Sequence, residues 1–270
     1  MPWRGERIET MESCDFLDLL KERGLLPAAP VAAAEASLQP VEGTTIVAVR
    51  CADGVVVAGD RRATMGNSVV YDRANKVLII DDEAVMAIAG SPAVAWDIAR
   101  MLEMSVQYYR RSQLQGLSLD GKVRTLSRLL RQNLPLAMQG IGAVVPIFAA
   151  FDHEAAEGKI FFYDLLGAEF ECVDFCATGS GAHIVRGALY YQNRWGPQPL
   201  RAMAGEQAVE LVLKMLETAA EYDTATGGFR EAAHIFPQVV QVTAAGLHTV
   251  PDADLAAFYL RLSSGRSQRA

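Results

Sequence analysis

The sequence predicts an α+β fold in which two stacked sheets form a sandwich and a pair of helices covers each outer face. Three features predict it: strand patterns arrive as hairpins, helix patterns arrive in pairs, and several strand patterns are apolar almost throughout. A doubly wound parallel sheet would instead alternate strand and helix. Continuously apolar strands are typical of sheets buried on both faces, which this four-layer αββα arrangement provides.

The first strand pattern begins late in the chain, at Thr44. Residues 1–43 hold 4 basic and 8 acidic residues, a weak amphipathic pattern in "CDFLDLLKERGLLP" and the Ala- and Pro-rich stretch "AAPVAAAEASLQP". This composition is typical of a weak helix followed by a poorly ordered linker. We expect one globular domain over residues 44–270, because its length and apolar content allow a sizeable core.

Two hairpins and two helices are predicted first. "TTIVAVRC" and "GVVVAGD" are β-branched runs separated by a turn signal at residues 52–54. "KVLIID" and "AVMAIAG" repeat this pattern across the acidic residues 81–83. Helices follow, because "SPAVAWDIARMLEMSVQYYRRSQ" and "DGKVRTLSRLLRQNL" place apolar residues at helical intervals.

The second half of the domain repeats this order. "AVVPIFAAFD", "GKIFFYDLL" and "AEFECVDFCATG" predict strands, and the last of them would place Cys172 and Cys176 on one face. Two helices follow, the second being "AGEQAVELVLKMLETAAEYD". "FPQVVQVTAAG" then predicts the last strand, before a short C-terminal helix.

The composition excludes several classes of function. A net charge of −7, a pI near 5.2 and the lack of a basic block argue against a nucleic-acid or anionic-membrane surface. No run of 18 apolar residues occurs, and the N-terminus is unlike a secretory signal. The four cysteines are therefore expected to be reduced, and neither they nor the four histidines have the spacing of a metal site. We expect a cytoplasmic protein without metal or cofactor.

Thr44 is the first candidate for chemistry. A threonine hydroxyl is a weak nucleophile unless a base lies beside it, and a cut between Gly43 and Thr44 would create that base as a new α-amino group. The pKa of such an amine, about 7.7 to 8.0, leaves part of it unprotonated at neutral pH. Gly43 permits the tight backbone geometry in which the hydroxyl attacks the preceding carbonyl, so the chain could cut itself. The alternative is that Gly43 only makes a turn before a strand.

Asp60 and Lys76 are the next candidates. Asp60 ends "GVVVAGD" and Lys76 opens "KVLII", so the two could form a buried ion pair at the ends of adjacent strands. There the ammonium group would lower the pKa of neighbouring groups and help to orient the Thr44 hydroxyl. Taken separately, each residue is equally well an ordinary turn or surface residue.

Gly90 and Ser180 both stand where a strand pattern gives way to a helix pattern. Gly90 closes "AVMAIAG", and Ser91 and Pro92 follow as N-cap and first helical residue, so the Gly90 N–H could face an oxyanion. Backbone freedom alone explains this glycine equally well. Ser180, in "TGSGAHIVRGAL", is either an N-cap or a hydroxyl beside the nucleophile.

These motifs occur together in a known order. "GTTIVAVRCADGVVVAGDRRATMGN", "NKVLII", "AIAGSPA", "ATGSGA" and "YDTATGG" resemble the β-subunits of the 20S proteasome, most closely those of the actinobacterial type. The resemblance spans residues 44–243 and implies a threonine-type endopeptidase of the N-terminal nucleophile hydrolase fold. It also implies that residues 1–43 are a propeptide, removed by autocleavage between Gly43 and Thr44.

The resemblance implies a role for each candidate. Thr44 would be the nucleophile and, through its amino group, the base, with Asp60 and Lys76 as orienting and pKa-tuning partners. The backbone N–H of Gly90 would form the oxyanion hole.

Two residues near the end of the long helix gain a role only from the resemblance. By themselves, Asp223 and Thr226 in "EYDTATGG" indicate a C-terminal helix cap. In the family, the positions of Ser180 and Asp223 form a supporting pair near the threonine amino group. Thr226 stands where many relatives carry serine, and the hydroxyl is kept.

The resemblance further implies how a peptide substrate is held. The family binds it as an added strand along the segments around Thr64 and Gly90. Pro92 departs from the pattern, because proline has no N–H and one main-chain contact is expected to be lost. The implied pocket is small or apolar, which predicts preference for an apolar residue on the acyl side of the cut; its residues are Ala63, Ala74, Leu78, Ile88 and Trp96.

Partners are implied as well. Such β-subunits form homo-heptameric rings that stack with heptameric α-subunit rings into a barrel of twenty-eight subunits, with the threonines facing a closed chamber. A ring-shaped regulatory ATPase would act through the α rings. The substrates would be unfolded proteins tagged by a prokaryotic ubiquitin-like protein.

Three other functions remain open. A two-ring bacterial peptidase that partners an unfoldase is built from shorter chains without a long propeptide. A non-catalytic ring subunit lacks the threonine, whereas Thr44, Asp60 and Lys76 are all present here. A small-molecule amidase shares the fold without the "GDRRAT" and "GSGA" pair.

Overall fold

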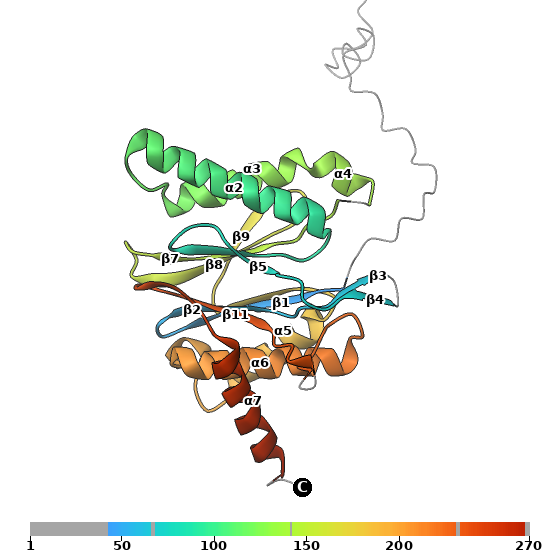
Figure 1. Ribbon diagram of the computed structural model, residues 1–270. Coiled ribbons are helices and arrows are strands. Elements are labelled where there is room, and N and C mark those ends of the chain that lie inside the picture. The colour runs from blue at the N-terminus through green and yellow to red at the C-terminus, as the bar shows by residue number, and fades with distance from the viewer. Residues whose placement is uncertain (1–42, 66–67, 141, 231–232, 268–270) are drawn as a thin grey trace, which may run out of the picture. The chain divides into compact units, whose positions relative to one another are not determined.

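The computed structural model describes residues 43–65, 68–140, 142–230 and 233–267. These residues all belong to the second of the two units into which the chain divides, Leu38–Ala270. The expected helix and linker before Gly43 lie outside the described residues. Within the second unit, two stacked sheets are flanked by helices on both outer faces (Figure 1). The predicted α+β sandwich of four layers is confirmed.

The sheet that contains the start of the domain has five antiparallel strands in the order β10-β1-β2-β11-β12. The first predicted hairpin forms its centre. The bounds of the strands are Thr45–Cys51 for β1, Gly54–Gly59 for β2, Phe175–Gly179 for β10, Gln238–Thr243 for β11 and Gly246–Thr249 for β12.

The facing sheet also has five antiparallel strands, in the order β5-β6-β7-β8-β9. Its strands are Val77–Ile79 (β5), Ala84–Ala87 (β6), Ile147–Asp152 (β7), Glu157–Tyr163 (β8) and Glu169–Cys172 (β9). A separate short hairpin pairs β3 (Ala63–Met65) with β4 (Ser68–Tyr71).

Two helix pairs cover the sandwich (Figure 1). The pair α2 (Pro92–Gln113) and α3 (Leu119–Gln132) packs on the sheet of β5 to β9, and the pair α5 (Ala182–Trp195) and α6 (Gly205–Tyr222) packs on the other sheet. Shorter elements are α4 (Leu134–Met138), the 3₁₀ helix η1 (Leu200–Ala202) and the C-terminal α7 (Asp252–Ser267). None of the helices in the described ranges has the length and apolar character needed to cross a bilayer.

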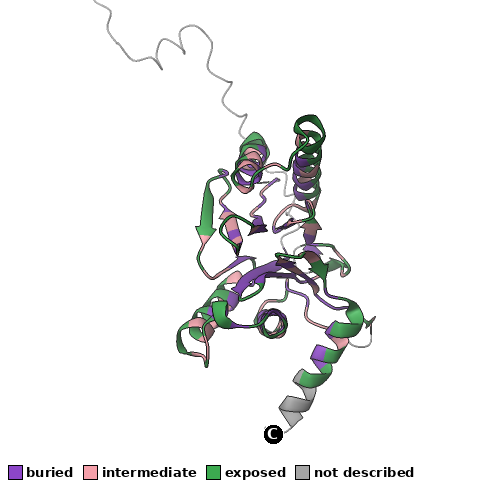
Figure 2. Ribbon diagram, turned by 90° about the vertical axis from the view of Figure 1, so that its left-hand side faces the viewer, coloured by how far each residue is buried: buried purple, intermediate pink, exposed green. Residues whose placement is uncertain are grey.

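The core consists of three apolar layers, and the central strands contribute to two of them at once. Along β1, Ile46 and Ala48 face the other sheet, whereas Val47 and Val49 face the helices α5 and α6. Every residue of β1, β2 and β6 is buried. Figure 2 shows buried residues, in purple, concentrated in the strands inside the sandwich. The continuous apolar runs of the sequence therefore reflect burial on both faces, where burying each Val, Ile or Met side chain stabilises the fold by about 1.5–3 kcal/mol.

The predicted single strand "AEFECVDFCATG" is wrong, because the chain changes sheets within it. A bend at Val173 and Asp174 separates β9 from β10, and these strands pair with β8 and β1 in different sheets. The Asp174 carbonyl accepts a hydrogen bond from the Arg50 N–H at 2.8 Å, which fixes the crossing point. A run of β-forming residues does not show where such a crossing falls, because both halves have the same propensity.

Candidate active site

Three strand ends bring the main candidates to one end of a sheet. β1 begins where β10 and β2 end, since their terminal residues pair in antiparallel register. Thr44 precedes β1, Asp60 follows β2 and Ser180 follows β10. All three therefore lie together, although Ser180 is more than a hundred residues from the others in sequence.

Thr44 is 6% exposed and is held against its preceding carbonyl. Its Oγ1 donates to the Gly43 O at 2.6 Å, and its own carbonyl accepts hydrogen bonds from Ser180 N at 2.8 Å and Ser180 Oγ at 3.2 Å. A Cβ at Gly43 would lie 2.1 Å from Thr64 Oγ1 and 2.9 Å from Ala225 O. Glycine is required at 43 because these neighbours leave no room for a side chain.

Asp60 is fully buried and accepts four hydrogen bonds. Its Oδ1 accepts from Thr45 N and Lys76 Nζ, both at 2.7 Å, and its Oδ2 accepts from Arg62 N and Gly227 N, both at 2.9 Å. A buried carboxylate needs such donors, because an unpaired charge inside a protein is costly. Asp60 thus joins β1 to two loops and fixes the position of the lysine.

Lys76 is 4% exposed, and its ammonium group contacts three oxygens. Nζ lies 2.7 Å from Asp60 Oδ1, 3.1 Å from Gly43 O and 2.5 Å from Arg62 O. Burial lowers the pKa of Lys76, and the Asp60 carboxylate opposes this shift without reversing it. The predicted pair is present, but the expectation of adjacent strands is wrong: β2 and β5 belong to different sheets, so the pair spans the sandwich.

Ser180, Asp223 and Thr226 form a hydrogen-bonded network beside Thr44. Asp223 Oδ2 accepts from Ser180 Oγ at 2.6 Å and from Thr226 Oγ1 at 2.5 Å. Thr226 is fully buried, and its hydroxyl also lies 2.5 Å from Thr45 Oγ1. The network reaches Thr44 through Ser180, whose hydroxyl contacts the Thr44 carbonyl.

The sequence allowed Ser180 and Asp223 to serve only as helix caps, and the structure gives a different answer for each residue. The N-cap of α5 is Gly181, so Ser180 does not cap that helix. Asp223 does occupy the C-cap position of α6, and its N–H bonds to Ala219 O at 2.8 Å. Its carboxylate is nevertheless turned to the two hydroxyls, so the residue ends the helix and belongs to the site.

Gly90 has a backbone that favours glycine, with a φ of 105°. A Cβ there would lie 2.1 Å from Ala143 O, the carbonyl that accepts a hydrogen bond from Ser91 N at 2.8 Å. Among the hydrogen bonds of the described residues, none joins Gly90 to Thr44. The oxyanion role of its N–H stays a prediction.

The predicted substrate residues lie in β3, shortly before and within β5, directly after β6 and in helix α2. Thr64 is buried beside Gly43, and Ile88 N donates to Lys76 O at 2.8 Å, so both border the candidate site. Trp96 is 47% exposed on α2. The remaining residues are half-buried: Ala63, Ala74 and Leu78.

Four further residues hold the site together and were not singled out from the sequence. Thr45 and Gly227 donate to Asp60 through their backbones, and Arg62 donates through its guanidinium to the Thr224 and Thr226 carbonyls at 2.9 and 3.2 Å. Gln238 Oε1 accepts from the backbone N–H groups of residues 76 and 77, both at 3.0 Å. These are mostly backbone contacts, for which a sequence carries little signal.

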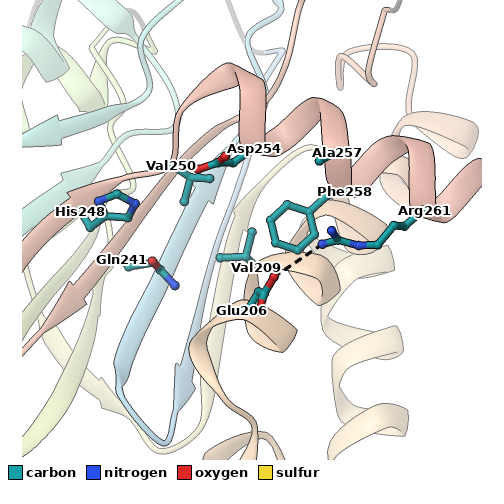
Figure 3. A pocket seen from close by; sticks show the side chains of 9 residues that line it. All are labelled: Glu206, Val209, Gln241, His248, Val250, Asp254, Ala257, Phe258 and Arg261. Atoms are coloured by element: carbon teal, nitrogen blue, oxygen red, sulfur yellow. Dashed lines mark ion pairs between the residues drawn. The ribbon is translucent and has the colours of Figure 1, made fainter.

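A separate cavity of about 350 Å³ lies between α6, α7 and the β11–β12 hairpin. Figure 3 shows Glu206 facing Arg261, at 3.7 Å between Oε1 and Nη2, and Phe258 beside the guanidinium group. None of the predicted site residues lines this cavity. Over the described ranges, no three His, Cys, Asp or Glu side chains are grouped so that they could hold a metal ion.

Comparison with known proteins gives consistent matches. The family model described as "Proteasome subunit" matches residues 41–235. The chain is 40% identical over 227 residues to "Proteasome subunit beta 2" of Thermomonospora curvata, covering 84% of this chain and 79% of that one. It is 39% identical over 231 residues to "Proteasome subunit beta" of Acidimicrobium ferrooxidans (86% and 82%) and 37% identical over 226 residues to "Proteasome subunit beta" of Jonesia denitrificans (84% and 72%).

Proposed function

The chain belongs to the proteasome subunit family, as a β-type member, and from this we propose that it is the precursor of a threonine-type endopeptidase that cuts its own Gly43–Thr44 bond. The observation that carries the proposal is the position of the Thr44 hydroxyl. It lies 2.6 Å from the carbonyl oxygen of the bond to be cut, and the Lys76 ammonium lies 3.1 Å from the same oxygen.

Self-cleavage would proceed in two steps. The Thr44 Oγ attacks the Gly43 carbonyl carbon, and negative charge develops on the Gly43 oxygen. The C–N bond then breaks as the proton of the hydroxyl passes to the nitrogen, which leaves an ester and a free α-amine. The Lys76 ammonium stabilises the developing charge, as a preorganised donor in a buried site does. Water then hydrolyses the ester, which releases residues 1–43 and leaves Thr44 as the first residue.

Peptide cleavage would use the group that self-cleavage creates. The free amine of Thr44 takes the proton of the hydroxyl, whose oxygen attacks the peptide carbonyl carbon. The amine returns this proton to the leaving nitrogen as the peptide C–N bond breaks, and water then hydrolyses the acyl enzyme. The adjacent Lys76 ammonium lowers the pKa of this amine, and Asp60 holds the lysine in place. Ser180 and Asp223 orient the Thr44 backbone through its carbonyl. We assign oxyanion donation to the Gly90 N–H.

We propose the partners that a proteasome β-subunit requires. The chain would be a subunit of a cytoplasmic proteasome core, in heptameric β rings between heptameric α rings. A ring-shaped ATPase would deliver unfolded proteins carrying a ubiquitin-like tag. Enclosure in a barrel explains how a site with broad peptide specificity is kept from folded proteins.

The test is the intact mass and N-terminal sequence of the protein co-produced with its α-subunit. Wild type should begin at Thr44, Thr44→Ser should also be cut, and Thr44→Ala should keep residues 1–43. The processed wild type should hydrolyse fluorogenic peptides with an apolar residue before the cut, and Thr44→Ala should not.

Two results would contradict the proposal. Full-length wild type in assembled particles would leave Thr44 without a free amine and favour the non-catalytic ring subunit. Equal peptide hydrolysis by wild type and Thr44→Ala would place the activity elsewhere.

A further inference from the structure

The side chain of Gln238 reaches from one sheet to the edge strand of the other. Gln238 is the first residue of β11, and β5 is the outermost strand of the facing sheet. The Gln238 Oε1 accepts hydrogen bonds from the backbone N–H groups of Lys76 and Val77, both at 3.0 Å, and its Nε2 donates to Val77 O at 2.6 Å. Both ends of the amide are therefore bound to the backbone at the start of β5.

These hydrogen bonds lie on the side of β5 that has no neighbouring strand. The Lys76 carbonyl accepts from Ile88 N, directly after β6, at 2.8 Å. The Val77 N–H and C=O are instead bound to Gln238. An edge strand otherwise leaves such groups unpaired, and an amide side chain offers them one acceptor and one donor, as a neighbouring strand would. Gln238 thus takes the place of a neighbouring strand beside Lys76.

A glycine opposite Gln238 makes room for the lysine side chain. Gly59 pairs with Gln238 across β2 and β11, and it directly precedes Asp60. A Cβ at Gly59 would lie 3.2 Å from Lys76 Cβ, so the stem of the lysine packs closely against this glycine. The lysine is therefore held at its backbone by Gln238, along its stem at Gly59 and at its ammonium group by Asp60.

We propose that Gln238 is a positioning residue for Lys76, which ties the start of β5 to β11 and so places the lysine ammonium against the Gly43 carbonyl. This inference rests on the proposed function, in which that ammonium stabilises charge on the Gly43 oxygen and acts on the Thr44 amine. The ammonium lies 3.1 Å from Gly43 O and 2.7 Å from Asp60 Oδ1. A displacement of the lysine backbone by about 1 Å would stretch such contacts beyond hydrogen-bonding distance.

The first measurement is the rate of self-cleavage of the full chain, co-produced with its α-subunit. Gln238→Met keeps the length of the side chain but removes its three hydrogen bonds to residues 76 and 77. Self-cleavage should slow about tenfold, which is less than the loss on removing an electrostatic donor outright. Gln241→Met is the matched control and should be cut at the wild-type rate. Gln241 belongs to the same strand but lies on its other face, beside the separate cavity of Figure 3.

The pH dependence of peptide hydrolysis by processed particles distinguishes positioning from a general loss of structure. Moving the Lys76 ammonium about 1 Å away from the Thr44 amine lets the pKa of that amine rise toward its ordinary value. Because the amine must be unprotonated to act, the acid limb of kcat/KM should move to higher pH by about half a pH unit in Gln238→Met. A purely structural role would lower kcat/KM equally at every pH. The other charged groups of the site are the same in every variant: Asp60, Arg62 and Asp223.

Gln238→Asn supplies the same pH profile if Gln238→Met is not processed to completion. Its amide is one methylene shorter and cannot keep all three hydrogen bonds unless β5 moves, so its acid limb should also lie at higher pH. An active wild type whose acid limb is shared by both variants would overturn this inference alone, whereas an inactive wild type would contradict the proposed function. Failure of both variants to form particles would also overturn the inference, because Gln238 would then support the fold and not the lysine.

Discussion

Position 43 contributes to the candidate site by having no side chain. Thr64 Oγ1 and Ala225 O close around the Cα of Gly43, and the Lys76 ammonium contacts its carbonyl. The carbonyl oxygen therefore contacts both the Thr44 hydroxyl and the Lys76 ammonium group. From the sequence, a turn glycine and a cleavage-site glycine were indistinguishable; the packing around residue 43 gives a specific reason for glycine.

Gly43→Ala should slow self-cleavage by a factor on the order of 100, because displacing the scissile carbonyl by about 1 Å has that kind of effect on reactions that depend on alignment. The added Cβ would lie 2.1 Å from Thr64 Oγ1, so the backbone or Thr64 must move. The measurement is the fraction of chains that begin at Thr44 over time, by intact mass, in assembled particles.

Gly187→Ala is the matched control, since a Cβ at Gly187 in α5 meets nothing within 4 Å. Adding Thr64→Ala to Gly43→Ala should recover part of the rate, because the nearest clashing atom is removed. Cleavage of Gly43→Ala at the wild-type rate would show that the close packing around residue 43 does not govern the reaction.

The elements that could be predicted from sequence are those defined by local pattern. The hairpin of β1 and β2 and the helices α2, α3 and α6 all lie where periodicity indicated. The strand β11 lies within the predicted last strand, but its partner β12 and the β3–β4 hairpin were missed, because these three strands are short and largely exposed and give little pattern. Asp60 and Lys76 were paired correctly, yet their strands were placed in one sheet, because sheet membership depends on long-range pairing that propensity does not encode.

Tyr163 joins a strand to a helix through one buried hydroxyl. It is fully buried in β8, and its hydroxyl donates to the Val123 O of α3 at 3.1 Å. Burial raises the pKa of Tyr163 well above its ordinary value, and the charge of Glu169 adds to the shift. The folded protein therefore retains this proton at a pH where an unfolded tyrosine has lost it.

Tyr163→Phe should lower the free energy of unfolding by about 1 kcal/mol near neutral pH, the usual contribution of one hydrogen bond. Above pH ~10 the folded wild type binds more protons than its unfolded chain, so its stability falls as pH rises, by at most about 1.4 kcal/mol per pH unit for this residue. The variant lacks this loss, and the gap to wild type should shrink.

Urea unfolding from about pH 7 to pH 11 measures both effects of Tyr163→Phe. Tyr108→Phe provides the control, because Tyr108 is 74% exposed on α2 and its removal should change neither stability nor pH dependence. A constant gap between Tyr163→Phe and wild type at every pH would contradict the account.

The candidate site belongs to the molecule as a whole, because neither sheet contains it alone. Asp60 comes from the sheet of β1, and Lys76 comes from the facing sheet. Their ion pair is almost completely buried, at one end of the apolar layer between the sheets. The same contact therefore determines where the ammonium group meets the Gly43 carbonyl and how the two halves of the sandwich are aligned.

Replacing Asp60 or Lys76 should lower the free energy of unfolding by different amounts. Asp60→Asn leaves the Lys76 ammonium buried without a counter-charge, which should lower the free energy of unfolding by about 3–5 kcal/mol at neutral pH. Lys76→Met should cost less, because the Asp60 carboxylate keeps its three backbone donors. Adding Lys76→Met to Asp60→Asn should recover stability, since the uncompensated charge is gone.

The pH dependence of unfolding stability distinguishes the effect of the Lys76 charge from that of apolar packing. The folded pKa of Lys76 is already below its ordinary value of 10.5, so between the two values the folded state binds fewer protons than the unfolded chain and stability rises with pH. Asp60→Asn removes the carboxylate charge that stabilises the ammonium, so the folded pKa of Lys76 falls further and this pH range widens. The stability lost in Asp60→Asn should therefore shrink as pH rises toward 10.

Urea unfolding of Thr44→Ala precursors at about pH 7 and pH 9.5 measures this change in the free energy of unfolding, without interference from processing. The exposed pair of Asp120 and Arg124 supplies the control, since Asp120→Asn should cost only about 0.3–0.5 kcal/mol. Equal, pH-independent losses for Asp60→Asn and Lys76→Met would mean that the sheets are aligned by apolar packing and that the pair serves the chemistry alone.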